Sequence, residues 1–161
     1  MTIAIGDKLP SATFHIKPGN SVETTTTEDV FAGKTIAMFG LPGAFTPTCH
    51  AAHLPGYMEA LGRFTEGGVD QVVCLSVNDA HVLKAWADAS DADGKILFLA
   101  DGNADFSKAV GLDIDLGVAG MGVRCQRFSM LVKDGVVTAL HIEPSPGQAV
   151  ETSAEVLLKS L

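Results

Sequence analysis

The chain is poor in cysteine and has no closely spaced cysteine pair. Only three cysteines occur among its 161 residues, at Cys49, Cys74 and Cys125, and none of them forms a C-x-x-C pair. This spacing excludes a zinc ribbon and a vicinal dithiol motif, and an odd number of distant thiols does not suggest a disulfide framework. At least one thiol is therefore expected to be free.

Basic residues and long apolar runs are also scarce. Eleven Lys and Arg against nineteen Asp and Glu give a formal net charge of −8, which disfavours nucleic acid or an anionic membrane as a partner. No apolar run approaches the ~20 residues that span a bilayer, and the N-terminus lacks the pattern of a signal peptide. We expect a cytoplasmic protein with a single domain over residues 1–161.

Apolar periodicity predicts alternating strands and helices along the chain. The expected strands are 34–41, 71–77 and 95–101; the expected helices are 46–66, 78–89, 104–111 and 147–161; a hairpin is expected over 127–143 with Asp134-Gly135 as its turn. This order implies an α/β fold, with a mixed central β-sheet flanked by helices on both faces. The arrangement resembles the thioredoxin fold.

The segment GLPGAFTPTCH, residues 40–50, lies where an expected strand passes into an expected helix. Loops at the carboxyl ends of strands are the usual location of chemistry in such sheets. If the helix begins near Thr46, Pro47 occupies its first turn, where a missing N–H costs nothing. Cys49 then lies close to unpaired N–H groups and the positive end of the helix dipole, which favour the thiolate over the thiol. A reactive cysteine is the preferred interpretation, the alternative being a small buried side chain.

The other two thiols and the histidines suggest no such chemistry. Cys74 lies within an apolar strand, where burial would keep it inert, and Cys125 is expected to be structural or incidental. The histidines at positions 50, 53 and 81 are not spaced as metal ligands and are interpreted as structural or surface residues. No Gly-rich phosphate loop follows a strand, so we expect neither a cofactor nor a metal.

Several segments together resemble the peroxiredoxin family. Pro42, Thr46 and Cys49 match its P-x-x-x-T-x-x-C motif, and the segments HLPGY, SVNDAHVLKAW, LADGNADFSKAVGL and RCQRFSMLVKDGVV are similar to the peroxiredoxin 5 (type II) subgroup. The resemblance runs from about residue 3 to the C-terminus. It implies a thioredoxin fold and a thiol peroxidase that reduces hydrogen peroxide and alkyl hydroperoxides.

The resemblance also implies roles for four residues. Cys49 corresponds to the peroxidatic cysteine, Thr46 to the hydroxyl that orients the peroxide, and Pro42 to the residue that shields the site. Arg127 corresponds to the arginine that closes the site, whereas Arg124 falls outside the matching position and is expected to be a solvated charge. The subgroup resemblance further suggests a homodimer formed around the active-site loops.

The chain departs from some subgroup members in how the oxidised cysteine would be recycled. Those members carry a resolving cysteine near the C-terminus, but no cysteine follows Cys125 here. We therefore expect one-cysteine behaviour with glutathione or glutaredoxin as reductant, thioredoxin being the lesser candidate and Cys125 only a possible internal partner. A peroxide sensor or redox relay, and an interaction module with a vestigial Cys49, are the alternative functions.

Overall fold

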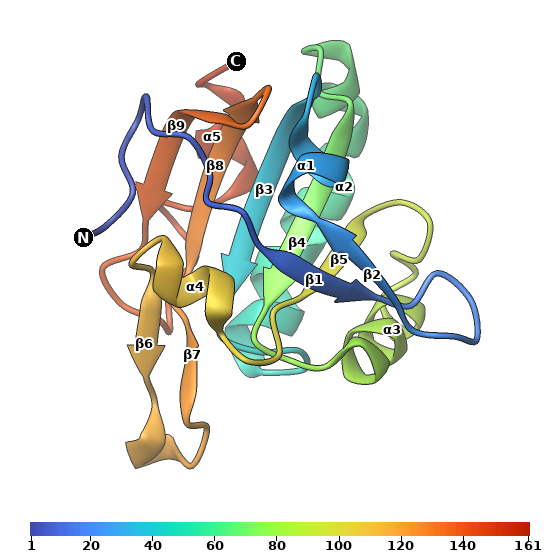
Figure 1. Cartoon of the computed structure of the whole chain (residues 1–161), viewed down its shortest axis with the longest axis vertical. Coiled ribbons are helices and arrows are strands. Elements are labelled where there is room, and N and C mark those ends of the chain that lie inside the picture. The colour runs from blue at the N-terminus through green and yellow to red at the C-terminus, as the bar shows by residue number, and fades with distance from the viewer.

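A computed structural model describes residues 1–161, which form a seven-stranded sheet and a separate two-stranded ribbon (Figure 1). The spatial order of the sheet is β2 (Glu23–Thr26), β1 (Thr13–Ile16), β5 (Leu97–Ala100), β4 (Gln71–Ser76), β3 (Thr35–Leu41), β8 (Phe128–Lys133) and β9 (Val136–Ile142). Strands β3, β4 and β5 are parallel, and the other pairs are antiparallel. The predicted mixed sheet is confirmed.

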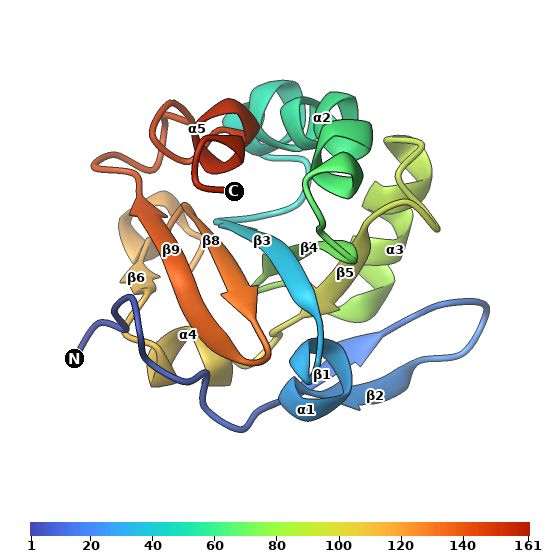
Figure 2. The same ribbon diagram turned by 90° about the horizontal axis from the view of Figure 1, so that it is seen from above.

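Helices cover both faces of the sheet, as Figure 2 shows from above. One face carries α2 (Leu54–Glu66), α3 (Ala80–Ala89) and α5 (Ala154–Leu158), and the other carries α1 (Thr27–Phe31) and α4 (Asp105–Ala109). Each face has its own cluster of 20 buried residues. Side chains alternate between the two clusters along β3, because successive residues of a strand point to opposite faces.

Most predicted elements are present, with two kinds of error. The 127–143 hairpin is confirmed, and its turn residues Asp134 and Gly135 both have positive φ (48° and 77°), as a type I′ turn requires. The closing helix was expected over 147–161 but forms only at 154–158, after Ser153 caps it and accepts a bond from the Val156 N–H. The β1–β2 hairpin, α1 and the ribbon of β6 (Asp113–Asp115) and β7 (Val123–Cys125) were not predicted.

Close packing between β3 and β8 fixes one glycine at the centre of the sheet. Gly40 pairs with Phe128 across the two antiparallel strands, and a Cβ at position 40 would overlap the Phe128 ring. Only glycine therefore leaves room for the ring beside this part of β3. None of the helices is both long and apolar enough to cross a membrane.

Candidate active site

Cys49 lies in the first turn of the helix that follows β3. The loop 42–46 leaves the end of β3, helical structure starts at Pro47, and the His50 N–H donates to the Thr46 carbonyl at 2.9 Å. The predicted helix start is therefore confirmed. Residues Cys49–His53 form a π-helical turn that leads into α2, with the Leu54 N–H bonded to the Cys49 carbonyl. Such π-turns occur often at functional sites.

Arg127 directly contacts the sulfur of Cys49. Its Nη2 donates to Cys49 Sγ at 3.1 Å and to the Pro146 carbonyl at 2.9 Å, while Nε donates to the same carbonyl at 3.2 Å. The residue is only 2% exposed, and no carboxylate lies within 4.0 Å of its guanidinium. Because no acidic group neutralises it locally, this buried cation favours the thiolate form of Cys49.

His53 belongs to the same group of side chains, a contact that residue spacing alone did not predict. Its Nδ1 accepts from Arg127 Nη1 at 2.9 Å, so its Nε2 carries the proton and donates to the Thr152 carbonyl at 3.0 Å. Burial, followed by the charge of Arg127, lowers the pKa of His53 to about 3. His53 was interpreted as a structural or surface residue, and it is buried. Its contact with Arg127 was not predicted, although its position four residues after Cys49 on a helix was an available signal.

The loop before Cys49 is held by hydrogen bonds from both of its sides. The Thr46 hydroxyl donates to the Gly43 carbonyl at 2.7 Å, and Pro42 is buried at the end of β3. Arg124 donates from Nη1 to the Pro42 carbonyl at 3.2 Å and from Nε to the Met121 carbonyl at 2.8 Å. Arg124 was expected to be a solvated charge, which is wrong, because it ties the β6–β7 ribbon to the loop.

The same loop contains a strained, exposed aromatic residue. Phe45 has a φ of 62° although it is not glycine, and its side chain is 51% exposed. The conformation is supported at the preceding residue, where the Ala44 N–H donates to Asn78 Oδ1 at 2.9 Å. Strained backbone of this kind clusters at active and binding sites.

Cys74 and Cys125 are both fully buried, and Cys125 belongs to the cluster on the α4 side of the sheet. Burial raises the pKa of Cys74 well above its ordinary value and that of Cys125 to about 12. Cys74 shares the α2-side cluster with Cys49, whereas Cys125 belongs to the cluster on the α4 side and donates its S–H to the Leu41 carbonyl at 3.0 Å. Cys125 is the last residue of β7 and precedes β8 by three positions.

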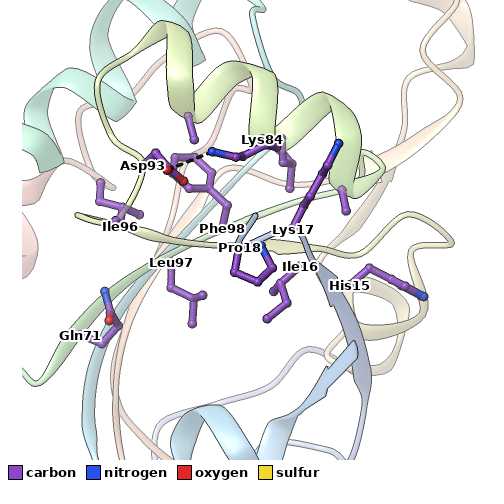
Figure 3. Close-up of a pocket in the computed structure, with 14 residues that line it drawn as sticks. His15, Ile16, Lys17, Pro18, Gln71, Lys84, Asp93, Ile96, Leu97 and Phe98 are labelled. Atoms are coloured by element: carbon purple, nitrogen blue, oxygen red, sulfur yellow. Dashed lines mark ion pairs between the residues drawn. The ribbon is translucent and has the colours of Figure 1, made fainter. Parts of the chain in front are cut away.

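Two cavities lie away from Cys49. One, of about 220 Å³, is bounded by the end of β1, by α3 and by β5, and the Lys84–Asp93 ion pair crosses its rim (Figure 3). The other, of about 360 Å³, is lined by residues that include Asp79, His81 and Asp101. Neither is lined by the predicted site residues, and a peroxide group needs no space of this size. No cluster of side chains is arranged to hold a metal ion.

The chain is similar to known proteins over almost its whole length. The Redoxin family model matches residues 4–158. Peroxiredoxin-2E-2, a chloroplastic protein of Oryza sativa subsp. japonica, is 43% identical over 165 residues, which cover 99% of this chain and 73% of the rice protein. Peroxiredoxin-2B of Arabidopsis thaliana is 39% identical, with coverage of 99% and 98%. The crystal structure of reduced Prx3 from Vibrio vulnificus in complex with H2O2 superposes with a TM-score of 0.92 at 43% identity, covering 99% of this chain and 96% of that one.

Proposed function

Because the chain belongs to the Redoxin family and, within it, to the peroxiredoxins of the peroxiredoxin 5 (type II) subgroup, we propose that Cys49 is the peroxidatic cysteine of this peroxidase. The observation that carries the assignment is the contact of 3.1 Å between Cys49 Sγ and Arg127 Nη2. Neither Cys74 nor Cys125 has a cation in such contact, and burial raises the pKa of both. Cys49 is therefore the thiol that can react as a thiolate.

The reaction is a displacement at the O–O bond. The Cys49 thiolate attacks the terminal peroxide oxygen, an S–O bond forms, and the O–O electron pair leaves on the second oxygen as hydroxide or alkoxide, which takes up a proton. Cys49 becomes a sulfenic acid. Since the Thr46 proton is directed to the Gly43 carbonyl, its oxygen can accept the O–H of the peroxide and orient it. Arg127 can donate to the oxygens as negative charge moves between them.

Hydrogen peroxide and alkyl hydroperoxides are the proposed substrates. Support for the first comes from the Vibrio vulnificus relative, which was crystallised with H2O2. Pro42 is buried at the start of the loop 42–46 that precedes Cys49, and it would shield the reacting sulfur from water.

We further propose one-cysteine recycling by glutathione and glutaredoxin, with thioredoxin as the lesser candidate. No cysteine follows Cys125, Cys125 lies in the cluster on the opposite side of the sheet from Cys49, and Cys74 is fixed on a central strand. An internal disulfide would need the two Cα atoms within about 7 Å and suitably aligned side chains. The sulfenic acid is therefore left for an external thiol. A cytoplasmic location stays a prediction.

A homodimer around the active-site loops is also proposed. The exposed Phe45 of the active-site loop and the exposed Val118 of the β6–β7 ribbon give this end of the molecule apolar surface that a second copy could cover. Size-exclusion chromatography with light scattering of the wild type and a Phe45→Asp variant tests this. A wild type that stays monomeric at assay concentration would contradict it.

Peroxide turnover measured in parallel with glutathione, glutaredoxin plus glutathione, and thioredoxin tests the function and the reductant together. Turnover with the glutathione system is expected. Rapid oxidation of Cys49 without turnover by any of the three would instead favour a redox relay. After one equivalent of peroxide and no reductant, intact-mass spectrometry should show one added oxygen. A loss of two hydrogens would identify an internal disulfide and contradict the one-cysteine proposal.

A further inference from the structure

Two backbone carbonyls of a single segment hold the two basic side chains of the site. The segment 144–152 follows β9, and its Pro146 carbonyl accepts both Arg127 bonds. Its Thr152 carbonyl accepts from His53 Nε2 and from the Tyr57 hydroxyl, at 3.0 and 2.9 Å. These side chains are buried, so a change in the direction of either would break these bonds. The orientation of Arg127 toward the sulfur therefore depends on how firmly this backbone is held.

The carboxylate of Glu143 binds residues 150–152, at the end of this segment. Its Oε1 accepts from the N–H groups of Val150 and Glu151 at 3.1 and 3.2 Å. Its Oε2 accepts from the N–H and the hydroxyl of Thr152 at 3.0 and 2.8 Å. The backbone N–H of Glu143 donates to the Arg127 carbonyl at 2.9 Å. One residue thus joins the backbone of Arg127, which immediately precedes β8, to the segment that receives its guanidinium.

Few other bonds restrain the segment. The Thr48 hydroxyl donates to the Gly147 carbonyl at 2.9 Å, and two local backbone bonds, Gln148 N–H to Ser145 and Ser153 N–H to Val150, close turns within it. Apart from the bonds that the Thr152 carbonyl accepts from His53 and Tyr57, the four bonds to Glu143 are what join residues 150–152 to the body of the protein.

Glu143 is buried and has no cation partner. The residue is 5% exposed, and no Lys, Arg or His nitrogen lies within 4.0 Å of its carboxylate. Burial alone would favour the neutral acid, but the bonds from Thr152 and from the N–H groups of Val150 and Glu151 outweigh it and keep the pKa of Glu143 below its ordinary value. A buried carboxylate is costly to retain unless its hydrogen bonds are satisfied. All four are supplied by the segment that positions the site.

We infer that Glu143 is a positioning residue of the peroxidatic site: by binding residues 150–152 it fixes the Thr152 and Pro146 carbonyls, and through them it holds His53 and Arg127 in place beside Cys49. Glu143 itself does not contact the reacting atoms. This inference rests on the proposed function, because it assigns Arg127 and Cys49 their roles.

Glu143→Gln is the informative variant. Glutamine has nearly the same shape, but its amide nitrogen cannot accept from the Thr152 N–H, and the charge is lost. Glu66→Gln is the matched control, because it removes the same charge from an exposed side chain at the end of α2. Two readouts are needed: the second-order rate of Cys49 oxidation by H2O2, and the pH midpoint of Cys49 alkylation by iodoacetamide, mapped by mass spectrometry.

Glu143→Gln should slow oxidation by about 10- to 100-fold, the range expected for a small misplacement of catalytic groups, and should move the alkylation midpoint to higher pH. Glu66→Gln should match the wild type in both. If Glu143→Gln is folded by circular dichroism and also matches the wild type, the inference is overturned. If it does not fold, Thr152→Val, which removes only the hydroxyl bond, takes its place, and wild-type values for that variant overturn the inference equally. Alkylation requires no peroxide, so a shifted midpoint in a protein that does not react with H2O2 would reject the peroxidase function while retaining the positioning role.

Discussion

Replacing Arg127 by alanine should slow the reaction of Cys49 with hydrogen peroxide by about 10- to 150-fold. The variant removes the Nη2 donor that lies 3.1 Å from the Cys49 sulfur. A hydrogen bond to a charged group contributes about 1.5–3 kcal/mol, and each 1.36 kcal/mol corresponds to about tenfold in rate. The oxidation rate of Arg127→Lys should lie between those of Arg127→Ala and the wild type. Lysine keeps the positive charge but cannot bond the sulfur, His53 and Pro146 at once.

Arg124→Ala is the control for this prediction. Arg124 donates to the Pro42 and Met121 carbonyls and not to the sulfur. Its loss removes no bond to the reacting atoms, so it should change the rate by no more than about threefold, which corresponds to about 0.6 kcal/mol in the activation free energy. Stopped-flow fluorescence can follow the reaction, since the single tryptophan, Trp86, donates from its indole nitrogen to His50 at 2.9 Å, next to Cys49. Equal slowing in both alanine variants would refute the assignment of Arg127 as the arginine that acts on the sulfur.

Three further outcomes follow from burial and packing. Cys49→Ser should abolish peroxide turnover, whereas Cys74→Ser should keep turnover within a few-fold of the wild type and mainly lower the melting temperature. Turnover by Cys49→Ser, measured as peroxide loss, would reject the assignment of Cys49 as the nucleophile. The pKa of His53 is about 3 in the fold against an ordinary 6.5, so the unfolded chain binds a proton that the folded chain excludes, and the unfolding free energy should fall as the pH drops from 6.5 toward 3. Urea titrations at pH 7 and pH 5 should show this loss in the wild type and a smaller one in His53→Gln; equal losses would contradict it. Gly40→Ala should cost about 1–3 kcal/mol through overpacking against the neighbouring ring, and an unchanged thermal midpoint would show that the strand accommodates the methyl group.

Local signals made the loop and the helix start predictable from sequence. Proline and threonine before Cys49 mark a helix N-terminus whatever the rest of the chain does, and the Asp134-Gly135 turn selects its hairpin in the same way. Strand β2 could not be recognised, because its sequence ETTT has no apolar alternation and forms an edge strand. The family resemblance, and not periodicity, identified Arg127.

The parts that the sequence did not reveal depend on contacts with backbone carbonyls. His53 and Arg127 are 74 residues apart and meet because both bond to the segment 144–152. Backbone carbonyl and N–H groups carry no sequence signature, so neither this pairing nor the bonds of Glu143 can be inferred from residue type. The bonds to Glu143 also explain why α5 begins at Ala154 and not at residue 147. The N–H groups of residues 150–152 donate to the Glu143 carboxylate and are not available to a helix.

Cys125 belongs to the cluster on the α4 side of the sheet and Cys49 to the other cluster. This placement limits which mutations could give Cys49 an internal partner for a disulfide. Cys125 bonds to the Leu41 carbonyl, whereas the segment 144–152 contacts Arg127, which bonds to the Cys49 sulfur. One substitution to cysteine in that segment is therefore the shortest route to a two-cysteine enzyme. Each disulfide formed there would draw the segment away from Arg127 and His53.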